Sequence, residues 1–209
     1  VDSKMSQDDN YFVGQKSRTV AWFVSNCRTQ SRRELVVRNL SLFIPVDIFG
    51  SCSSKKLCSD EHCSDGNNIL NQYHFYLSLE NSLCPDYVTE KIYRALAHGT
   101  IPVIYGGADY SRFLPRGSYV NALDFASPQE LAKRLDQIMN DDRMYKSFFQ
   151  WNKEYRVEKN PLDGWCRLCR LLNSKTNISS KSYQDIAAWW SGYQTNQSCH
   201  DPPLSLVGH

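Results

Sequence analysis

The sequence predicts an α/β fold in which a parallel, doubly wound sheet is flanked by helices. Residues 73–105 support this most directly, because an apolar strand, an amphipathic helix and a second apolar strand follow one another. Gly99 stands where that helix should stop, and this spacing is typical of a right-handed crossover. A second strand, loop and helix pattern begins near Thr19. With 209 residues, 41% of them hydrophobic, the chain can fill one core.

The elements before the crossover are predicted from short apolar runs and their punctuation. Leu35, Val36 and Leu40 recur at helical spacing, with Leu42 as a further candidate for the same face. Gly50 should end the strand that precedes it. The expected order is a polar connection at 1–18, a strand at 19–25, a helix within 31–42, a strand at 43–49 and a cysteine-containing loop at 51–68.

The later elements are predicted in the same way. The helix of the crossover should cover 88–98, with Val88, Ile92, Ala95 and Leu96 on one face. Ser127 to Glu130 has the capping-box pattern of a helix start. The expected order continues with strands at 73–79, 101–105 and 119–122, and helices from 127 to about 139 and near 144–155, 165–172 and 183–190. We expect one lobe at 19–175 and a carboxyl-terminal helix with a frayed tail at 176–209.

Composition excludes some partners. The 24 Lys and Arg against 22 Asp and Glu give a net charge of +2 without a dense basic block, so we do not expect nucleic acid binding. No apolar stretch approaches the roughly 18 residues that a membrane helix needs. The chain as given is therefore expected to be soluble.

Cysteines and glycosylation sequons indicate a secretory-lumen protein. Eight cysteines are more than a reduced cytosolic chain of this size usually carries, and Asn39, Asn177 and Asn196 each begin a sequon. We therefore expect a targeting segment upstream of Val1. The cysteines are Cys27, Cys52, Cys58, Cys63, Cys84, Cys166, Cys169 and Cys199.

We do not expect a metal site. Cys52, Cys58, Cys63 and His62 are close in sequence, but their spacings do not match the two-residue knuckle of structural zinc sites. Disulfides are the better prediction for these cysteines, with the pairing left open. No Asp-x-Asp motif is present to hold manganese.

The segment from Phe75 to Gly107 carries the most chemistry. A buried strand delivers Glu80, Asn81 and Ser82 to its carboxyl end, where open α/β sheets bind ligands. The next helix begins with Thr89, Glu90 and Lys91. Its free amides and the Lys91 ammonium could seat a diphosphate, while Glu90 could accept hydrogen bonds from ribose hydroxyls and Tyr87 could stack or donate its hydroxyl. A nucleotide-sugar would suit this geometry.

Structural roles remain open for the same residues. Thr89 and Glu90 could only cap the helix and complement its dipole, and Lys91 could be a solvated surface lysine. Asn81 could cap a turn.

The motifs of this segment also resemble those of a known family. The run LENS, then DYVTEK, then PVIYGG, together with VAWFVSNC and SRREL upstream and weaker agreement at WCRLC, is similar to the α1,3-fucosyltransferases of glycosyltransferase family ten, especially its invertebrate members. The resemblance implies a GT-B enzyme with two Rossmann-like lobes, of which this chain would be the carboxyl-terminal, donor-binding half.

The resemblance also implies roles for individual residues. Arg32 would contact the diphosphate of GDP-fucose, with Arg33 as its rival, and Lys91 would meet the same phosphates. Glu90 would bind ribose or fucose hydroxyls, and Arg32, Lys91 and Glu90 would form the catalytic set. The donor-binding residues implied are Ser25, Asn26, Arg32, Arg33, Asn81, Tyr87, Thr89, Glu90 and Lys91. The carboxylate base would lie on the other lobe, and no residue here is assigned to it.

The function that the resemblance implies is transfer of L-fucose from GDP-fucose in α1,3 linkage to an N-acetylglucosamine of an N-glycan or related glycan, in the Golgi lumen. The full-length protein would be a single-pass type II membrane protein without a tightly bound cofactor, with Mn²⁺ or Mg²⁺ at most stimulatory. Cys166 and Cys169 would join cysteines of the amino-terminal lobe. Alternatives are a non-catalytic GDP-sugar-binding fragment, a disulfide-rich secreted glycan-binding domain, or the same fold with another nucleotide-sugar donor.

Overall fold

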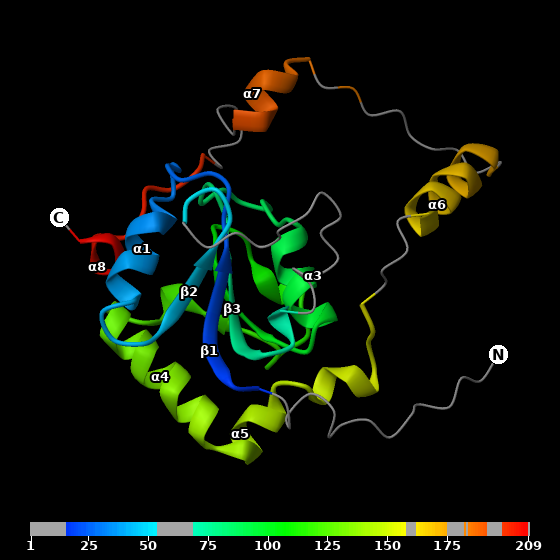
Figure 1. Cartoon of the computed structure of the whole chain (residues 1–209). Coiled ribbons are helices and arrows are strands. Elements are labelled where there is room, and N and C mark those ends of the chain that lie inside the picture. Colours follow the sequence, from blue (N-terminus) through cyan, green and yellow to red (C-terminus); the bar gives the residue numbers. More distant parts are fainter. Residues whose placement is uncertain are drawn as a thin grey trace.

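The protein is built on a five-stranded sheet. The computed structural model describes residues 16–53, 69–157, 162–174, 182, 184–191 and 198–208. All neighbouring strands run parallel in the order β2-β1-β3-β4-β5 (Figure 1), which confirms the predicted parallel α/β architecture. The strands are β1 (Arg18–Phe23), β2 (Val46–Phe49), β3 (Tyr73–Leu79), β4 (Ile101–Tyr105) and β5 (Val120–Asn121).

Helices follow the strands in the predicted order. The expected helix at 144–155 is divided into α5 and a 3₁₀ turn at Gln150–Lys153. No helix of the described residues is both long and apolar enough to traverse a bilayer. The α-helices are α1 (Arg33–Leu40), α3 (Glu90–Ala97), α4 (Pro128–Asn140), α5 (Asp142–Ser147), α6 (Leu162–Asn173), α7 (Ile186–Ser191) and α8 (Leu204–Val207).

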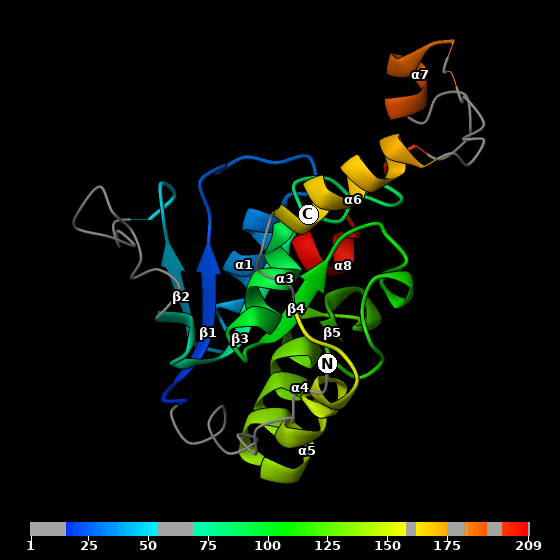
Figure 2. The ribbon, with the colours of Figure 1, turned by 90° about the vertical axis from the view of Figure 1, so that its right-hand side faces the viewer.

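Helices cover both faces of the sheet, because successive strand side chains point to opposite sides. In Figures 1 and 2, α1, α4 and α8 lie on one side of the strands and α3 on the other. A buried cluster contains Val20, Trp22 and Leu77 together with the inward faces of α1, α4 and α8. Ile104 packs with Ile92 of α3 in a separate cluster on the opposite face. Both faces of the central strands are therefore dry, as parallel sheets require.

The buried face of α1 differs from the prediction. Arg33, Val36, Val37 and Leu40 are buried, whereas Leu42 lies beyond the helix and is 75% exposed. These four positions follow the i, i+3, i+4, i+7 pattern of a single helical stripe. An arginine therefore heads the stripe that packs against the sheet.

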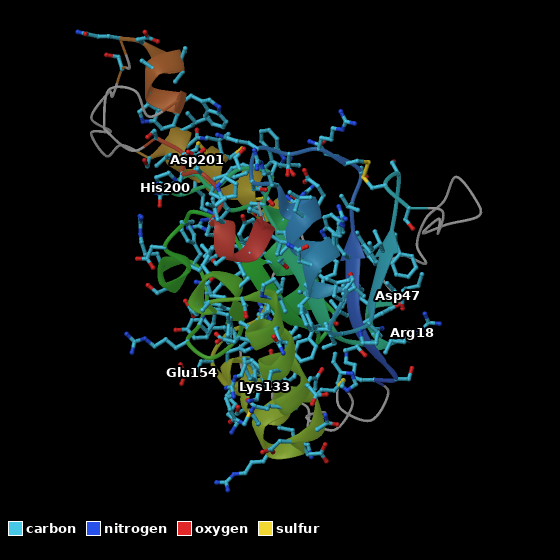
Figure 3. All side chains as sticks on the ribbon, turned by 90° about the vertical axis from the view of Figure 1, so that its left-hand side faces the viewer. Arg18, Asp47, Lys133, Glu154, His200 and Asp201 are labelled. Atoms are coloured by element: carbon cyan, nitrogen blue, oxygen red, sulfur yellow. A yellow bond between two sulfur atoms is a disulfide. The ribbon has the colours of Figure 1, made fainter. Side chains whose placement is uncertain are left out.

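The carboxyl-terminal segment is not the frayed tail that we expected. Cys199 forms a disulfide with Cys84, and the backbone N–H of His200 donates to the carbonyl of Leu83 at 2.8 Å. Leu206 and Val207 of α8 are only 1% and 4% exposed, because they join the main core beside α1. Figure 3 shows His200 near the end of the molecule toward which the strands point, whereas Arg18 marks the amino end of β1. Residues 198–208 are thus an integral part of the lobe.

Candidate functional site at the carboxyl edge of the sheet

The amino terminus of α3 is organised by a residue to which the sequence analysis assigned no role. Glu80 follows β3 directly and is completely buried. Its carboxylate accepts hydrogen bonds from the Thr89 backbone N–H at 2.9 Å, the Thr89 hydroxyl at 2.8 Å and Lys91 Nζ at 2.8 Å. Thr89 is the N-cap residue, yet its own side chain makes no capping bond to the helix. A carboxylate immediately after a predominantly apolar strand was the available sequence signal.

The ammonium group of Lys91 is held in place by two neighbouring side chains. Its Nζ contacts Glu80 and also donates to the Thr89 hydroxyl at 2.7 Å, and the side chain is only 15% exposed. An ammonium group has three hydrogens, so these two contacts leave one donor for a ligand. Glu90, the first residue of α3, is exposed beside it.

The two adjacent arginines have opposite environments. Arg33 is 3% exposed, and its guanidinium donates to the carbonyls of Leu79 at 2.6 Å and Asn26 at 3.3 Å. Burial lowers the pKa of Arg33, with the charge of Glu80 acting in the opposite direction. Arg32 is exposed and has a positive φ of 49°, a conformation that a non-glycine residue adopts at some energetic cost. Of the two rivals, only Arg32 presents its side chain to solvent.

Ser31 connects the arginine end of the site to the lysine end. Its hydroxyl donates to the Glu80 carbonyl at 2.7 Å, and its N–H donates to the Asn81 carbonyl at 3.0 Å. The Tyr105 hydroxyl fixes the Ser31 carbonyl at 2.9 Å. Arg32 follows Ser31 in the chain, and Lys91 binds the Glu80 side chain, so Glu80 contacts both Lys91 and the residue that precedes Arg32. The structure brings Arg32 and Lys91 to the same edge of the sheet.

Asn81 and Tyr87 lie on the loop between β3 and α3. The Asn81 Oδ1 atom is buried and, among the described residues, has no hydrogen-bond partner. Buried acceptors without partners are uncommon in folded proteins, so a donor group from a ligand would fit here. Tyr87 is half-buried, and its N–H donates to the Cys84 carbonyl. This loop is tied to the carboxyl-terminal segment through Cys84 and Leu83.

Ser25 and Asn26 lie in the loop after β1 and precede Arg32 in the chain. Both side chains are exposed, and the Asn26 carbonyl accepts a hydrogen bond from Arg33. The disulfide between Cys27 and Cys52 closes this loop onto the chain beyond β2. All nine predicted donor-binding residues are therefore carried by the loops and helix starts that follow β1 and β3, although Arg33 faces inward.

Sequence comparison decides the family. The conserved pattern of "Glycosyltransferase family 10 (fucosyltransferase) C-term" matches residues 13–189. The chain belongs to glycosyltransferase family 10. The predicted resemblance to this family is confirmed, and the matched range contains the positions of the candidate site.

Curated relatives agree with this family 10 assignment. The chain is 43% identical over 177 residues to Alpha-(1,3)-fucosyltransferase C of Drosophila melanogaster, covering 84% of this chain and 41% of the relative. It is 38% identical over 194 residues to Glycoprotein 3-alpha-L-fucosyltransferase A of the same organism, covering 90% and 38% respectively. The chain thus spans less than half the length of these relatives.

Solved structures show the same fold. A crystal structure of an α1,3-fucosyltransferase with GDP-fucose matches at a TM-score of 0.58 and 21% identity, over 84% of this chain and 52% of that one. The corresponding structure with GDP matches at a TM-score of 0.57 and 22% identity, over 79% and 49%. The parallel lobe therefore corresponds in fold to about half of these α1,3-fucosyltransferase structures.

Within this family 10 chain, the described cysteines form disulfides or lie free at the surface. Cys52 pairs with Cys27, so the expectation of disulfides is confirmed for that residue, while Cys58 and Cys63 lie outside the described residues. Cys166 and Cys169 are exposed free thiols on α6. In the parts of the chain that the structure describes, no cluster of three or more His, Cys, Asp or Glu residues could hold a metal ion.

The predicted glycosylation sites remain predictions. Asn39 lies on α1, and its Nδ2 atom, to which a glycan would attach, donates to the carbonyl of Leu206 at 3.0 Å. A glycan there would have to be accommodated beside α8. Asn177 and Asn196 lie outside the described residues.

Proposed function

We propose that this chain is the donor-binding half of an inverting α1,3-fucosyltransferase, which transfers L-fucose from GDP-fucose to an N-acetylglucosamine of an N-glycan or related glycan. The observation that carries the proposal is the placement of Arg32 and Lys91 at one edge of the sheet, where Glu80 binds Lys91 directly and binds Ser31, the residue before Arg32. The names of the curated relatives and the GDP-fucose complex of a structural neighbour support the choice of donor.

The two cations would stabilise the departing GDP. As the bond between the fucose anomeric carbon and the phosphate oxygen breaks, negative charge builds on the diphosphate, and Arg32 and Lys91 would be positioned to offset it. The free amides at the start of α3 add partial positive charge. Glu90 would bind ribose or fucose hydroxyls, and a donor hydroxyl would satisfy the buried Asn81 Oδ1 atom.

The acceptor hydroxyl would attack the anomeric carbon from the face opposite GDP, which inverts the configuration. Its proton would pass to a carboxylate base in the part of the enzyme beyond this chain. No carboxylate described here is assigned that role. We therefore expect this chain alone to bind the donor better than it transfers fucose.

Helix α6 would contact that other half. Every described side chain from Gly164 to Asn173 is exposed, and Trp165, Leu168 and Leu172 form an apolar stripe on it. The relatives are more than twice as long as the segment matched here, so a partner lobe of sufficient size would be available. Cys166 and Cys169 on the same helix would then form disulfides with that lobe.

We further propose that the full-length protein works in the Golgi lumen as a single-pass type II membrane protein. The two described disulfides are compatible with an oxidising compartment. Arg32 and Lys91 would take the place of a metal at the diphosphate, so Mn²⁺ or Mg²⁺ would at most stimulate transfer.

A donor panel on the full-length protein tests the function. We expect fucose transfer from GDP-fucose to an N-glycan acceptor, an α1,3 linkage in the product by NMR, and no transfer from other GDP-sugars or from UDP-sugars. GDP binding without transfer would favour the non-catalytic alternative. Glycan binding without nucleotide binding would favour the secreted glycan-binding domain.

A further inference from the structure

We propose that Glu80 is a positioning residue of the donor site, which acts by holding Lys91 and the first turn of α3 in place for the diphosphate. This inference rests on the proposed function, because it assigns a further residue to the same site. Glu80 would not touch the donor itself, since its side chain is completely buried.

Glu80 and its partner Thr89 together define the position of the Lys91 ammonium. One carboxylate oxygen accepts from the Thr89 N–H and hydroxyl, and the other accepts from Lys91 Nζ. Lys91 in turn donates to the Thr89 hydroxyl. The ring formed by Glu80, Thr89 and Lys91 leaves the ammonium little rotational freedom, so its remaining N–H has a fixed direction.

The main chain of Glu80 is equally constrained. Its N–H donates to the Tyr105 carbonyl at 2.9 Å, and its carbonyl accepts from the Ser31 hydroxyl. The carboxylate therefore originates from a point fixed by β4 and by the start of α1, next to Arg32. The distance between Arg32 and Lys91 therefore depends on the position of one residue, Glu80.

A purely stabilising role is a weaker explanation for this ion pair. Removing two charges from water costs free energy that their attraction often fails to recover, so buried ion pairs contribute little to stability on average.

Tyr110 provides the control residue. Gly106 leaves space for the Tyr110 hydroxyl, because a Cβ there would collide with that hydroxyl and approach Glu80 Cγ at 3.3 Å. The Tyr110 hydroxyl is buried without a partner among the described residues, so it offers a matched control near Glu80.

A double-mutant cycle on the full-length protein tests the proposal, with GDP affinity measured by calorimetry. Glu80→Gln keeps the shape and an acceptor for the Thr89 N–H, but it presents an NH₂ donor to the Lys91 ammonium. We expect Glu80→Gln to weaken GDP binding about tenfold with Lys91 present, and less than about twofold in the Lys91→Met background. Tyr110→Phe should leave the affinity unchanged. Equal losses in both backgrounds, or no loss in either, would overturn the proposal.

A second measurement does not depend on nucleotide binding. Acetylation of Lys91 by acetic anhydride, followed by mass spectrometry, should be several times faster in Glu80→Gln than in the wild type or Tyr110→Phe, because the amine loses its fixed partner. Unchanged labelling in Glu80→Gln would refute the positioning role. If wild-type protein fails to bind GDP while Lys91 labelling still depends on Glu80, the proposed function fails and the Glu80–Lys91 coupling stands.

Discussion

Arg33 Nη1 donates a hydrogen bond of 2.6 Å to the carbonyl oxygen of Leu79, which fastens the start of α1 to the end of β3. The guanidinium also lies 5.7 Å from the centre of the Trp22 ring. Because Arg33 is committed to the interior, its neighbour Arg32 is the arginine that can meet a ligand. The functional and structural roles of the pair are therefore separable by mutation.

Arg33→Ala should destabilise the fold. The change removes a bond to a buried carbonyl and leaves a cavity against Trp22, so we expect a loss of about 2–4 kcal/mol in the free energy of unfolding. Urea denaturation measures this loss. Arg38→Ala, on the same helix but exposed, should stay within about 0.5 kcal/mol of wild type. A similar small effect for Arg33→Ala would contradict the structural role.

Arg32→Gly should not destabilise the protein, although it removes a site residue. Arg32 has a φ of 49°, which glycine adopts without the steric cost of a Cβ. We expect the free energy of unfolding to stay unchanged or to rise by up to about 1 kcal/mol. Thermal unfolding of Arg32→Gly and Arg32→Ala separates the backbone effect from the side chain. Clear destabilisation by glycine would show that the Arg32 side chain supports the fold.

Cys199→Ser should loosen the donor loop. The disulfide with Cys84 and the hydrogen bond from His200 to Leu83 together anchor the loop that carries Asn81 and Tyr87. We expect a loss of about 2–4 kcal/mol of stability and faster hydrogen exchange in residues 83–87. Lys133→Ala, which changes an exposed side chain on α4, is the control. Exchange in the loop that matches the control would argue against the anchor.

His74 should make stability sensitive to acid. Burial lowers its pKa below the usual value, while its hydrogen bond with the Arg18 carbonyl, 2.9 Å from Nδ1, acts in the opposite direction and the charge of Lys16 lowers it further. The folded chain thus favours neutral His74, and the unfolded chain binds more protons in acid. The contribution of His74 to the free energy of unfolding should be constant above about pH 6.5. It should be lost as the pH falls from there through the pKa of His74 in the folded chain.

The comparison of His74→Phe with wild type isolates this effect, since phenylalanine retains a ring against Tyr145, whose centre is 5.2 Å from that of His74. Urea midpoints at about pH 7.5 and about pH 5.5 should differ less in the variant than in the wild type. An identical pH dependence in both proteins would assign the acid sensitivity to other groups.

The sequence predicted what is local and periodic. The crossover from β3 through α3 to β4 was predicted correctly, because buried strands and an amphipathic helix with Gly99 at its end leave their pattern in neighbouring residues. The return of residues 198–208 was missed, because the Cys84–Cys199 bridge spans 115 residues and leaves no local periodic signal.

The site was predicted in part for a similar reason. The structure places the predicted residues on the expected loops, and their role in donor binding stays a prediction. Spacing alone did not distinguish Arg32 from Arg33. The phase of α1 does so, because Arg33 lies on the stripe of Val36, Val37 and Leu40. Glu80 was placed at the end of its strand but given no role, because the function of a buried carboxylate becomes visible only through its partners, here Thr89 and Lys91.

The central claim is that Arg32 and Lys91 together hold the two phosphates of a nucleotide. Calorimetric titration of wild type, Arg32→Ala and Lys91→Ala with GDP and with guanosine tests it most directly, because guanosine lacks the phosphates. The account predicts that each variant loses at least about tenfold in GDP affinity and keeps its affinity for guanosine. Unchanged GDP binding in both variants, or equal losses for GDP and guanosine, would contradict it.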